Sequence, residues 1–252
     1  MDQKKALYQY LLILGDNSMI LGHRLSELCG HGPSLETDIA LTNISLDLFG
    51  QVRSLFQYAA QLSDKNLTED DIAMLRKERE YVNVVLVEQE NKDFAHVICR
   101  SYLFDAFQLL QLEQLRKSPD TMLSAIAEKT IKETKYHRRF SREWMKRLAG
   151  GTALSMQKTQ AALDHLYPFA SELFEDTNAE TIIAEQNICP APSSLKDSYF
   201  DLIHSEIKAA GLTVPDIPPR KVRGKQGIHS EAMGFILSEL QFMQKTYPNM
   251  SW

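Results

Sequence analysis

The sequence predicts an all-α protein built on a four-helix bundle, with a long crossover between its second and third helices. Three observations lead to this fold class. Apolar residues recur every three or four positions along four long segments. Clusters that contain Gly, Pro or Ser separate the first segment from the second and the third from the fourth. The one β-branched run, at residues 82–87, has no second strand with which to pair.

The first two predicted helices form an antiparallel hairpin. Residues 5–29 place a leucine at every seventh position, which turns one seam toward neighbouring helices. A Gly-His-Gly-Pro break at 30–33 ends this helix, and Ser34 is a favourable N-cap for the next. The second helix covers about 35–62 and carries one continuous apolar stripe.

A long connection follows, at about residues 63–92. It contains a short polar helix, Glu69 to Glu80, and then the β-branched run at 82–87. A lone strand has no hydrogen-bonding partner, so we expect this run to be a buried extended crossover.

The third helix is predicted at about 93–117 and the fourth at about 120–148, separated by Ser-Pro-Asp at 118–120. A hairpin, a long crossover and a second hairpin is the connectivity of a ferritin-like four-helix bundle. The remaining residues predict three further helical segments, at about 154–175, 194–210 and 230–246.

We therefore expect a single domain over residues 1–252, with a core bundle at about 5–149 and a C-terminal helical extension at about 150–252. The chain has 44% apolar and 24% charged residues and a formal charge of −5, which excludes a disordered or disulfide-based protein. This mild acidity gives no reason to expect nucleic acid or a membrane as a partner. Three widely separated cysteines favour buried thiols in a reducing cytoplasm.

A ferritin-like bundle can be tested for a di-iron site, which needs a carboxylate from each of two helices and Glu-x-x-His from each of the other two. Asp105 and Glu133 lie 14 residues either side of Pro119, so they should reach the same height in the second hairpin. His137 lies one turn further along. However, Thr134 is the residue three before His137, and Glu133 belongs to a different stripe of the helix.

The first hairpin supplies fewer ligands. The leucine seam of the first helix offers Ser18 at mid-height, and Asp47 is the nearby acid of the second helix, which has no histidine in reach. The best count is one histidine and two or three acids, against two and four. We therefore expect no bound metal and no catalytic residue, but buried acids paired with cations such as Arg24, Arg53, Lys132 and Arg138.

Two surfaces are candidates for a partner. Asp16, Met19 and His23 lie opposite the leucine seam, so the first helix is apolar on two sides and is expected to be covered by another protein chain. The second candidate is a basic loop that contains Arg220, Lys221, Arg223 and Lys225. This loop is either simply solvated, or it contacts a partner protein or the phosphate of an acyl-CoA. Gly224 and Gly227 within it resemble a phosphate loop but follow no strand.

Several stretches carry a family resemblance. They are Leu14-Gly15-Asp16-Asn17, Cys29-Gly30-His31-Gly32-Pro33, Leu46-Asp47-Leu48-x-Gly50-Gln51, Leu86-Val87-Glu88-Gln89, Phe104-Asp105-Ala106, Lys132-Glu133-x-x-Tyr136-His137 and Gly227-x-His229-Ser230-Glu231. Together they resemble the PaaC family, the non-catalytic ferritin-like component of the bacterial ring 1,2-phenylacetyl-CoA epoxidase, from the first helix to Trp252.

The resemblance implies a multicomponent oxygenase. Its catalytic component holds the di-iron centre and phenylacetyl-CoA, and a reductase delivers electrons from NADPH. The PaaC component is a ferritin-like paralogue of the catalytic one and binds no cofactor. By the same resemblance, His137 matches a ligand histidine, Thr134 replaces its glutamate and Asp105 matches the acid of the third helix. Phe49 and Val52 stand at the Glu-x-x-His of the second helix. His229 and the basic loop are further expected partner contacts.

Two alternatives stay open at this stage. The chain could be a metal-binding ferritin-like oxygenase in its own right, using Asp47, Asp105, Glu133 and His137. It could also be a helical scaffold or regulator unrelated to oxygenation.

Overall fold

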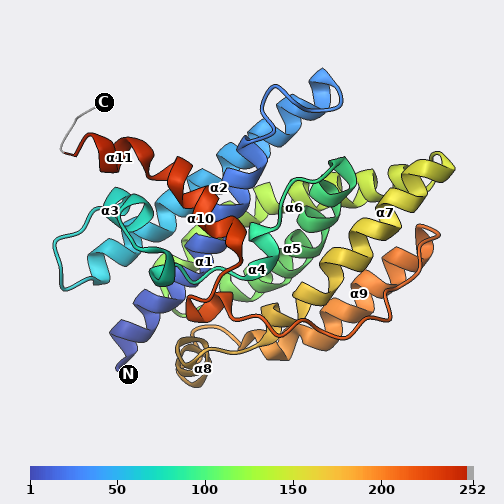
Figure 1. Cartoon of the computed structure of the whole chain (residues 1–252). Helices are drawn as coiled ribbons and strands as arrows, with labels where there is room; N and C mark the ends of the chain where they lie inside the picture. The colour runs from blue at the N-terminus through green and yellow to red at the C-terminus, as the bar shows by residue number, and fades with distance from the viewer. Residues whose placement is uncertain (249–252) are drawn as a thin grey trace. The chain divides into compact units, whose positions relative to one another are not determined.

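The computed structural model describes residues 1–248 and confirms the all-α fold class (Figure 1). Apart from one isolated bridge between Arg223 and Ile228, these residues form helices, turns and loops. No helix in this described range is long and apolar enough to cross a membrane.

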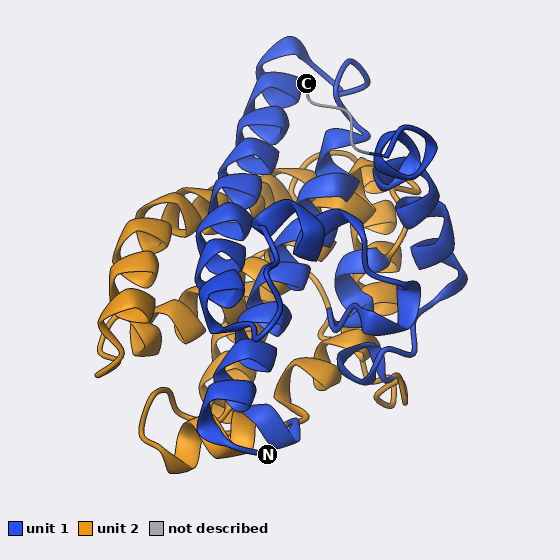
Figure 2. Ribbon diagram, turned by 90° about the vertical axis from the view of Figure 1, so that its left-hand side faces the viewer, with its two compact units in different colours: residues 1–88, 177–179, 223–252 blue, residues 89–176, 180–222 orange. Residues whose placement is uncertain are grey.

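The chain divides into two compact units, coloured separately in Figure 2. Unit 1 comprises residues 1–88, 177–179 and 223–252, and unit 2 comprises 89–176 and 180–222. Each unit is built on one of the two expected helical hairpins. The organisation as a single domain stays a prediction.

Unit 1 begins with the first hairpin, made of α1 (Gln3–Ser26) and α2 (Leu35–Leu62). The Ser34 side chain caps α2 as expected, accepting from the Thr37 amide at 3.3 Å. The two helices approach closely at Gly15, where an added Cβ would lie 2.2 Å from the Phe56 ring. The two helices of this hairpin therefore pack directly against each other.

The crossover of unit 1 differs from the expectation in its detail. The polar segment splits into α3 (Glu69–Met74) and a 3-10 turn (Glu78–Glu80), and the β-branched run ends in a helical turn, α4 (Val85–Glu88). The extended part ends at Val84 because side chains of α1, not a strand, accept its amides. Asp16 accepts from the Val82 amide at 2.9 Å and Asn17 from the Val84 amide at 2.8 Å.

The end of unit 1 returns to this crossover. It contains a 3-10 turn (Gly224–Gln226), α10 (Glu231–Leu240) and α11 (Phe242–Thr246). The single helix expected at 230–246 is interrupted at Gln241. Its buried side chain donates to the Arg76 carbonyl at 2.7 Å and to the Tyr81 hydroxyl at 3.0 Å.

Unit 2 is built on the second hairpin, α5 (Phe94–Leu115) and α6 (Thr121–Ala149), capped by Asp93 and Asp120. On it pack α7 (Ala153–Leu166), a 3-10 segment (Tyr167–Phe174) and α9 (Lys196–Ala209). The helix expected at 154–175 changes to 3-10 geometry near Pro168, which lacks an amide donor. A further helix, α8 (Asn178–Glu185), was not expected because eight residues are too few for a clear period.

Candidate functional site

The expected metal cluster lies inside unit 2, where α5 faces α6. Asp105 is 3% exposed and His137 is 1% exposed. The Ser141 hydroxyl donates to Asp105 Oδ2 at 2.7 Å, and the buried Thr134 hydroxyl donates to Gln108 Oε1 at 3.4 Å. The sequence thus placed Asp105 and His137 together correctly, and the hydroxyl groups of Ser141 and Thr134 lie in the same buried region.

The surroundings of Asp105 make its carboxyl easier to protonate than an aspartate in water. Burial raises the pKa of Asp105 to about 6, although the nearby His137, the Ser141 hydroxyl and Arg138 act in the opposite direction. Burial has the larger effect because a charged carboxylate is costly in an apolar interior. Asp105 therefore takes up a proton at a higher pH than an ordinary aspartate.

The donor set does not fit a di-iron centre. The cluster between α5 and α6 contains the His137 imidazole, the buried Asp105 carboxyl and the Thr134 hydroxyl, while Glu133 is half-buried on the adjacent stripe. Asp47 belongs to α2 of unit 1 and is also half-buried. Within residues 1–248, no group of three or more His, Cys, Asp or Glu side chains is placed to hold a metal ion. The interpretation of these five positions as a degenerate metal site stays a prediction.

Arg138, one of the cations expected to pair with a buried acid, pairs with an acid outside the predicted cluster. Arg138 forms an ion pair with Glu206 of α9, which the sequence reasoning did not single out, and its guanidinium lies 4.5 Å from the centre of the Tyr102 ring. The Tyr102 hydroxyl donates to the same Glu206 carboxylate at 2.9 Å. Unit 2 therefore contains an Arg–Glu–Tyr network between α5, α6 and α9.

The second apolar side of α1 is covered by the chain itself, which corrects our expectation for Asp16, Met19 and His23. Asp16 has no exposed surface, and the Arg76 guanidinium forms an ion pair with it. Met19 is 1% exposed and His23 is also buried. Arg76 in turn lies 4.2 Å from the centre of the Tyr81 ring. Because the crossover occupies this side, these side chains do not form an outer surface.

A second polar centre in unit 1 was not predicted. The buried Glu88 carboxylate accepts from His229 Nδ1 at 2.7 Å and Asn83 Nδ2 at 3.1 Å on one oxygen. Its other oxygen accepts from the Ser230 amide at 2.9 Å and from the Ser230 hydroxyl at 2.7 Å. His229 Nε2 lies 2.9 Å from the Tyr81 carbonyl. We call this arrangement the Glu88 clasp.

The clasp favours the doubly protonated form of the His229 ring. One ring nitrogen faces the Glu88 carboxylate and the other faces the Tyr81 carbonyl, and each of these oxygens accepts a hydrogen bond. Burial disfavours the charged ring, but the hydrogen bond and charge of Glu88 outweigh it and raise the pKa of His229 above its ordinary value. We expected His229 at a partner contact. Its side chain instead has no exposed surface and pairs with Glu88 inside unit 1.

Comparison with known proteins decides the family. A family model described as "Phenylacetic acid catabolic protein" matches residues 1–252. The chain belongs to this family. It is also similar to the C component of the 1,2-phenylacetyl-CoA epoxidase of Escherichia coli (strain K12), with 42% identity over 246 residues that cover 98% of this chain and 99% of the relative. The resemblance predicted from the motifs is confirmed, and the family is ferritin-like and all-α.

In this member of the phenylacetic acid catabolic family, the clasp joins two of the stretches that carried the resemblance, Leu86–Gln89 and Gly227–Glu231. The glycines at and before the second stretch serve close packing. An added Cβ would lie 2.3 Å from the Asn83 carbonyl oxygen at Gly224, and 2.3 Å from the Arg79 carbonyl oxygen at Gly227, whose φ is +75°. Backbone contact with the crossover therefore explains the glycines that resembled a phosphate loop.

The basic loop does not form one patch within a single unit. Arg220 and Lys221 are exposed in unit 2, Arg223 is exposed in unit 1, and Lys225 is buried. The Arg220 guanidinium lies 5.0 Å from the centre of the Phe169 ring. The role of the three exposed cations as partner or phosphate contacts stays a prediction.

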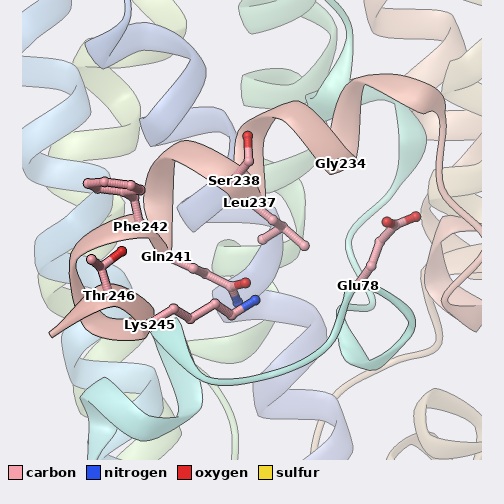
Figure 3. A pocket seen from close by; sticks show the side chains of 8 residues that line it. All are labelled: Glu78, Gly234, Leu237, Ser238, Gln241, Phe242, Lys245 and Thr246. Atoms are coloured by element: carbon pink, nitrogen blue, oxygen red, sulfur yellow. The ribbon is translucent and has the colours of Figure 1, made fainter. Parts of the chain in front are cut away.

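Among the hollows of unit 1, two are lined by residues of both the crossover and α10. The first, of about 350 Å³, lies along α10 and α11. Figure 3 shows Glu78 reaching toward α10 from the facing turn, with Gln241 and Lys245 further along. The described residues that line it include no histidine or cysteine. The second, of about 430 Å³, has an apolar lining that includes Met19, Phe49 and Val52.

Proposed function

We propose that this chain is a non-catalytic, structural subunit of a phenylacetyl-CoA 1,2-epoxidase complex that acts in aerobic phenylacetate degradation. The observation that carries the proposal is the 42% identity, covering 98% of this chain and 99% of the relative, to the protein named as the C component of that epoxidase. A match that runs from end to end of both chains favours the same place in the assembly, not a shared module.

The donor set of unit 2 supports the non-catalytic part of the proposal. Thr134 lies three residues before His137, at the position where a di-iron site needs a glutamate. The Asp105 carboxyl accepts a hydrogen bond from the Ser141 hydroxyl. One buried carboxyl and a single imidazole are fewer ligands than two iron ions need. In this proposal the di-iron centre and most contacts to phenylacetyl-CoA belong to the catalytic subunit, and electrons from NADPH arrive through a reductase.

The buried polar networks indicate what the chain contributes instead. The Glu88 clasp and the Arg138–Glu206–Tyr102 network each join segments that lie far apart in the sequence. Buried hydrogen bonds and ion pairs of this kind favour one arrangement of the helices within each unit. A helical subunit fixed in this way is suited to hold and orient a catalytic partner.

Metal analysis together with complex formation tests the proposal. The chain, produced with excess iron, should contain far less than one iron per molecule and should form a stable complex with the catalytic subunit in size-exclusion chromatography. Close to two irons per chain would instead establish a metal-binding oxygenase. Absence of any complex would favour the unrelated scaffold.

A buried variant separates a structural from a catalytic role of the cluster. His137→Gln keeps a polar side chain in the same place, so we expect the assembled complex to retain its epoxidase activity within about twofold. Assembly is measured in parallel, so that activity is expressed per complex. A loss of a hundredfold or more in an intact complex would show that His137 takes part in the chemistry.

A further inference from the structure

The second helix of unit 1 carries an apolar stripe that the chain leaves open. Leu35, Ile39 and Leu46 are 72%, 52% and 61% exposed, although α2 buries its other apolar side chains on the opposite face. Thr42 lies between Ile39 and Leu46, and Phe49 follows Leu46. The successive intervals from Leu35 to Phe49 are therefore four, three, four and three residues. This is the spacing of a seam between two paired helices.

The geometry of α2 places these five positions on one side. At about 100° per residue, they fall within an arc of roughly 80°. The buried stripe of α2, which includes Leu41, Ile44 and Leu48, lies on the other side of the helix. Three large exposed side chains in one row are unlike the scattered apolar residues of an ordinary surface, and such rows mark interaction sites.

The stripe leads into the second hollow of unit 1. Phe49 is its last member and also lines the hollow of about 430 Å³, together with Met19, Val52, Phe56, Met74 and Leu240. A ridge followed by an apolar hole is the shape that receives a helix, with one larger side chain inserted at its end. The length from Leu35 to Phe49 is roughly 21 Å at 1.5 Å per residue, or about four turns.

The charged side chains beside the stripe indicate which kind of partner would bind there. Glu36 is exposed on one flank of the row, and Asp70 is exposed at the rim of the hollow. The cation at that rim, Arg53, is already balanced by Glu69 at 3.6 Å. The surroundings of the stripe are therefore acidic, which favours a partner with Lys or Arg beside its seam. Two copies of α2 would bring these acids together, which disfavours a self-pair.

We propose that the α2 stripe, formed by Leu35, Ile39 and Leu46 and continued by Phe49 into the hollow, docks an amphipathic helix of the catalytic epoxidase subunit. The docked helix carries large aliphatic residues every three or four positions, flanked by Lys or Arg. The inference rests on the proposed function for the identity of the partner, and on the structure for the place and chemistry of the contact.

Binding of the purified catalytic subunit to single variants tests the proposal. Ile39→Lys and Leu46→Lys put a cation into the seam, so each should raise the Kd at least tenfold. Glu36→Lys should raise it by a smaller factor and reduce its dependence on salt. The matched control is Leu154→Lys on α7 of unit 2, because Leu154 is 61% exposed like Leu46. The control should stay within twofold of wild type, and all four variants should keep the wild-type helical spectrum.

The outcomes separate this inference from the proposed function. If the catalytic subunit binds wild type and both stripe variants equally, the docking surface is wrong and the proposed function stands. If the catalytic subunit does not bind wild type, the proposed function fails and the inference fails with it. A wild-type homodimer that Leu46→Lys dissociates would overturn the partner in favour of a second copy.

Discussion

The Glu88 clasp gives the sharpest stability prediction, because a single carboxylate accepts four of its hydrogen bonds. Glu88→Ala removes the acceptor of four donor groups, on His229, Asn83 and Ser230. These groups stay in the interior of unit 1, and His229 keeps only its contact with the Tyr81 carbonyl. We expect the segment from Arg223 onward to loosen from the crossover.

The magnitude follows from burial and charge. Neither the Glu88 nor the His229 side chain has exposed surface, so solvent screens their interaction weakly. Removing one member of a buried ion pair costs about 3–5 kcal/mol, mostly because the other charge is left without a partner. Glu88→Ala should lower the free energy of unfolding by that amount. The double variant with His229→Ala should lose less than the sum of the two single losses, since each removes the same bond.

The clasp also makes stability depend on pH with a defined sign. Because the folded-state pKa of His229 is raised, the folded protein binds the proton more tightly than the unfolded chain. The stabilisation is complete below the ordinary pKa of histidine and is lost as pH rises through the raised value. Wild type should therefore weaken above neutral pH, and Glu88→Ala should remove this part of the dependence.

Urea unfolding and limited proteolysis measure the two effects. Cleavage within residues 223–248 should be faster in Glu88→Ala than in wild type. The control is Glu90→Ala, two residues along and exposed, which should change stability by no more than about 0.5 kcal/mol. The reasoning is refuted if Glu88→Ala behaves like Glu90→Ala in both measurements.

Three further predictions concern close contacts and the cluster of unit 2. Gly227→Ala combines a positive φ with a Cβ 2.3 Å from the Arg79 carbonyl oxygen, so urea unfolding should show a loss of about 1–3 kcal/mol. Gly15→Ala places a Cβ 2.2 Å from the Phe56 ring and should cost about 1–3 kcal/mol by overpacking, with a lower melting temperature as the readout. For Asp105, the pKa of about 6 against 3.8 means that stability falls as pH rises between these values. We compare the free energies of unfolding of Asp105→Asn and wild type in urea. Between pH 3 and pH 7 the variant should gain about 3 kcal/mol relative to wild type. The same difference at both pH values would contradict the raised pKa of this buried carboxyl.

The sequence was most informative where short-range patterns decide the outcome. The long helices and their caps could be predicted directly, because apolar periodicity and residues such as Ser34 and Asp93 act within a few positions. The juxtaposition of Asp105 with His137 was also predictable, since a short turn fixes the relative height of two antiparallel helices. The crossover and the helix ends near Pro168 and Gln241 were less predictable, because distant partners or local breaks decide them.

The sequence by itself determined the all-α class, the two hairpins, the family resemblance and the shortage of metal ligands, because each depends on spacing along one or two neighbouring helices. Only the tertiary structure decided which charges are buried together. Nothing in the local sequence pairs Asp16 with Arg76 or Glu88 with His229, which lie 60 and 141 positions apart. Such pairs form because a buried charge must find a partner wherever the chain returns. That return buries the side of α1 that resembled an interface, while the stripe of α2 stays exposed.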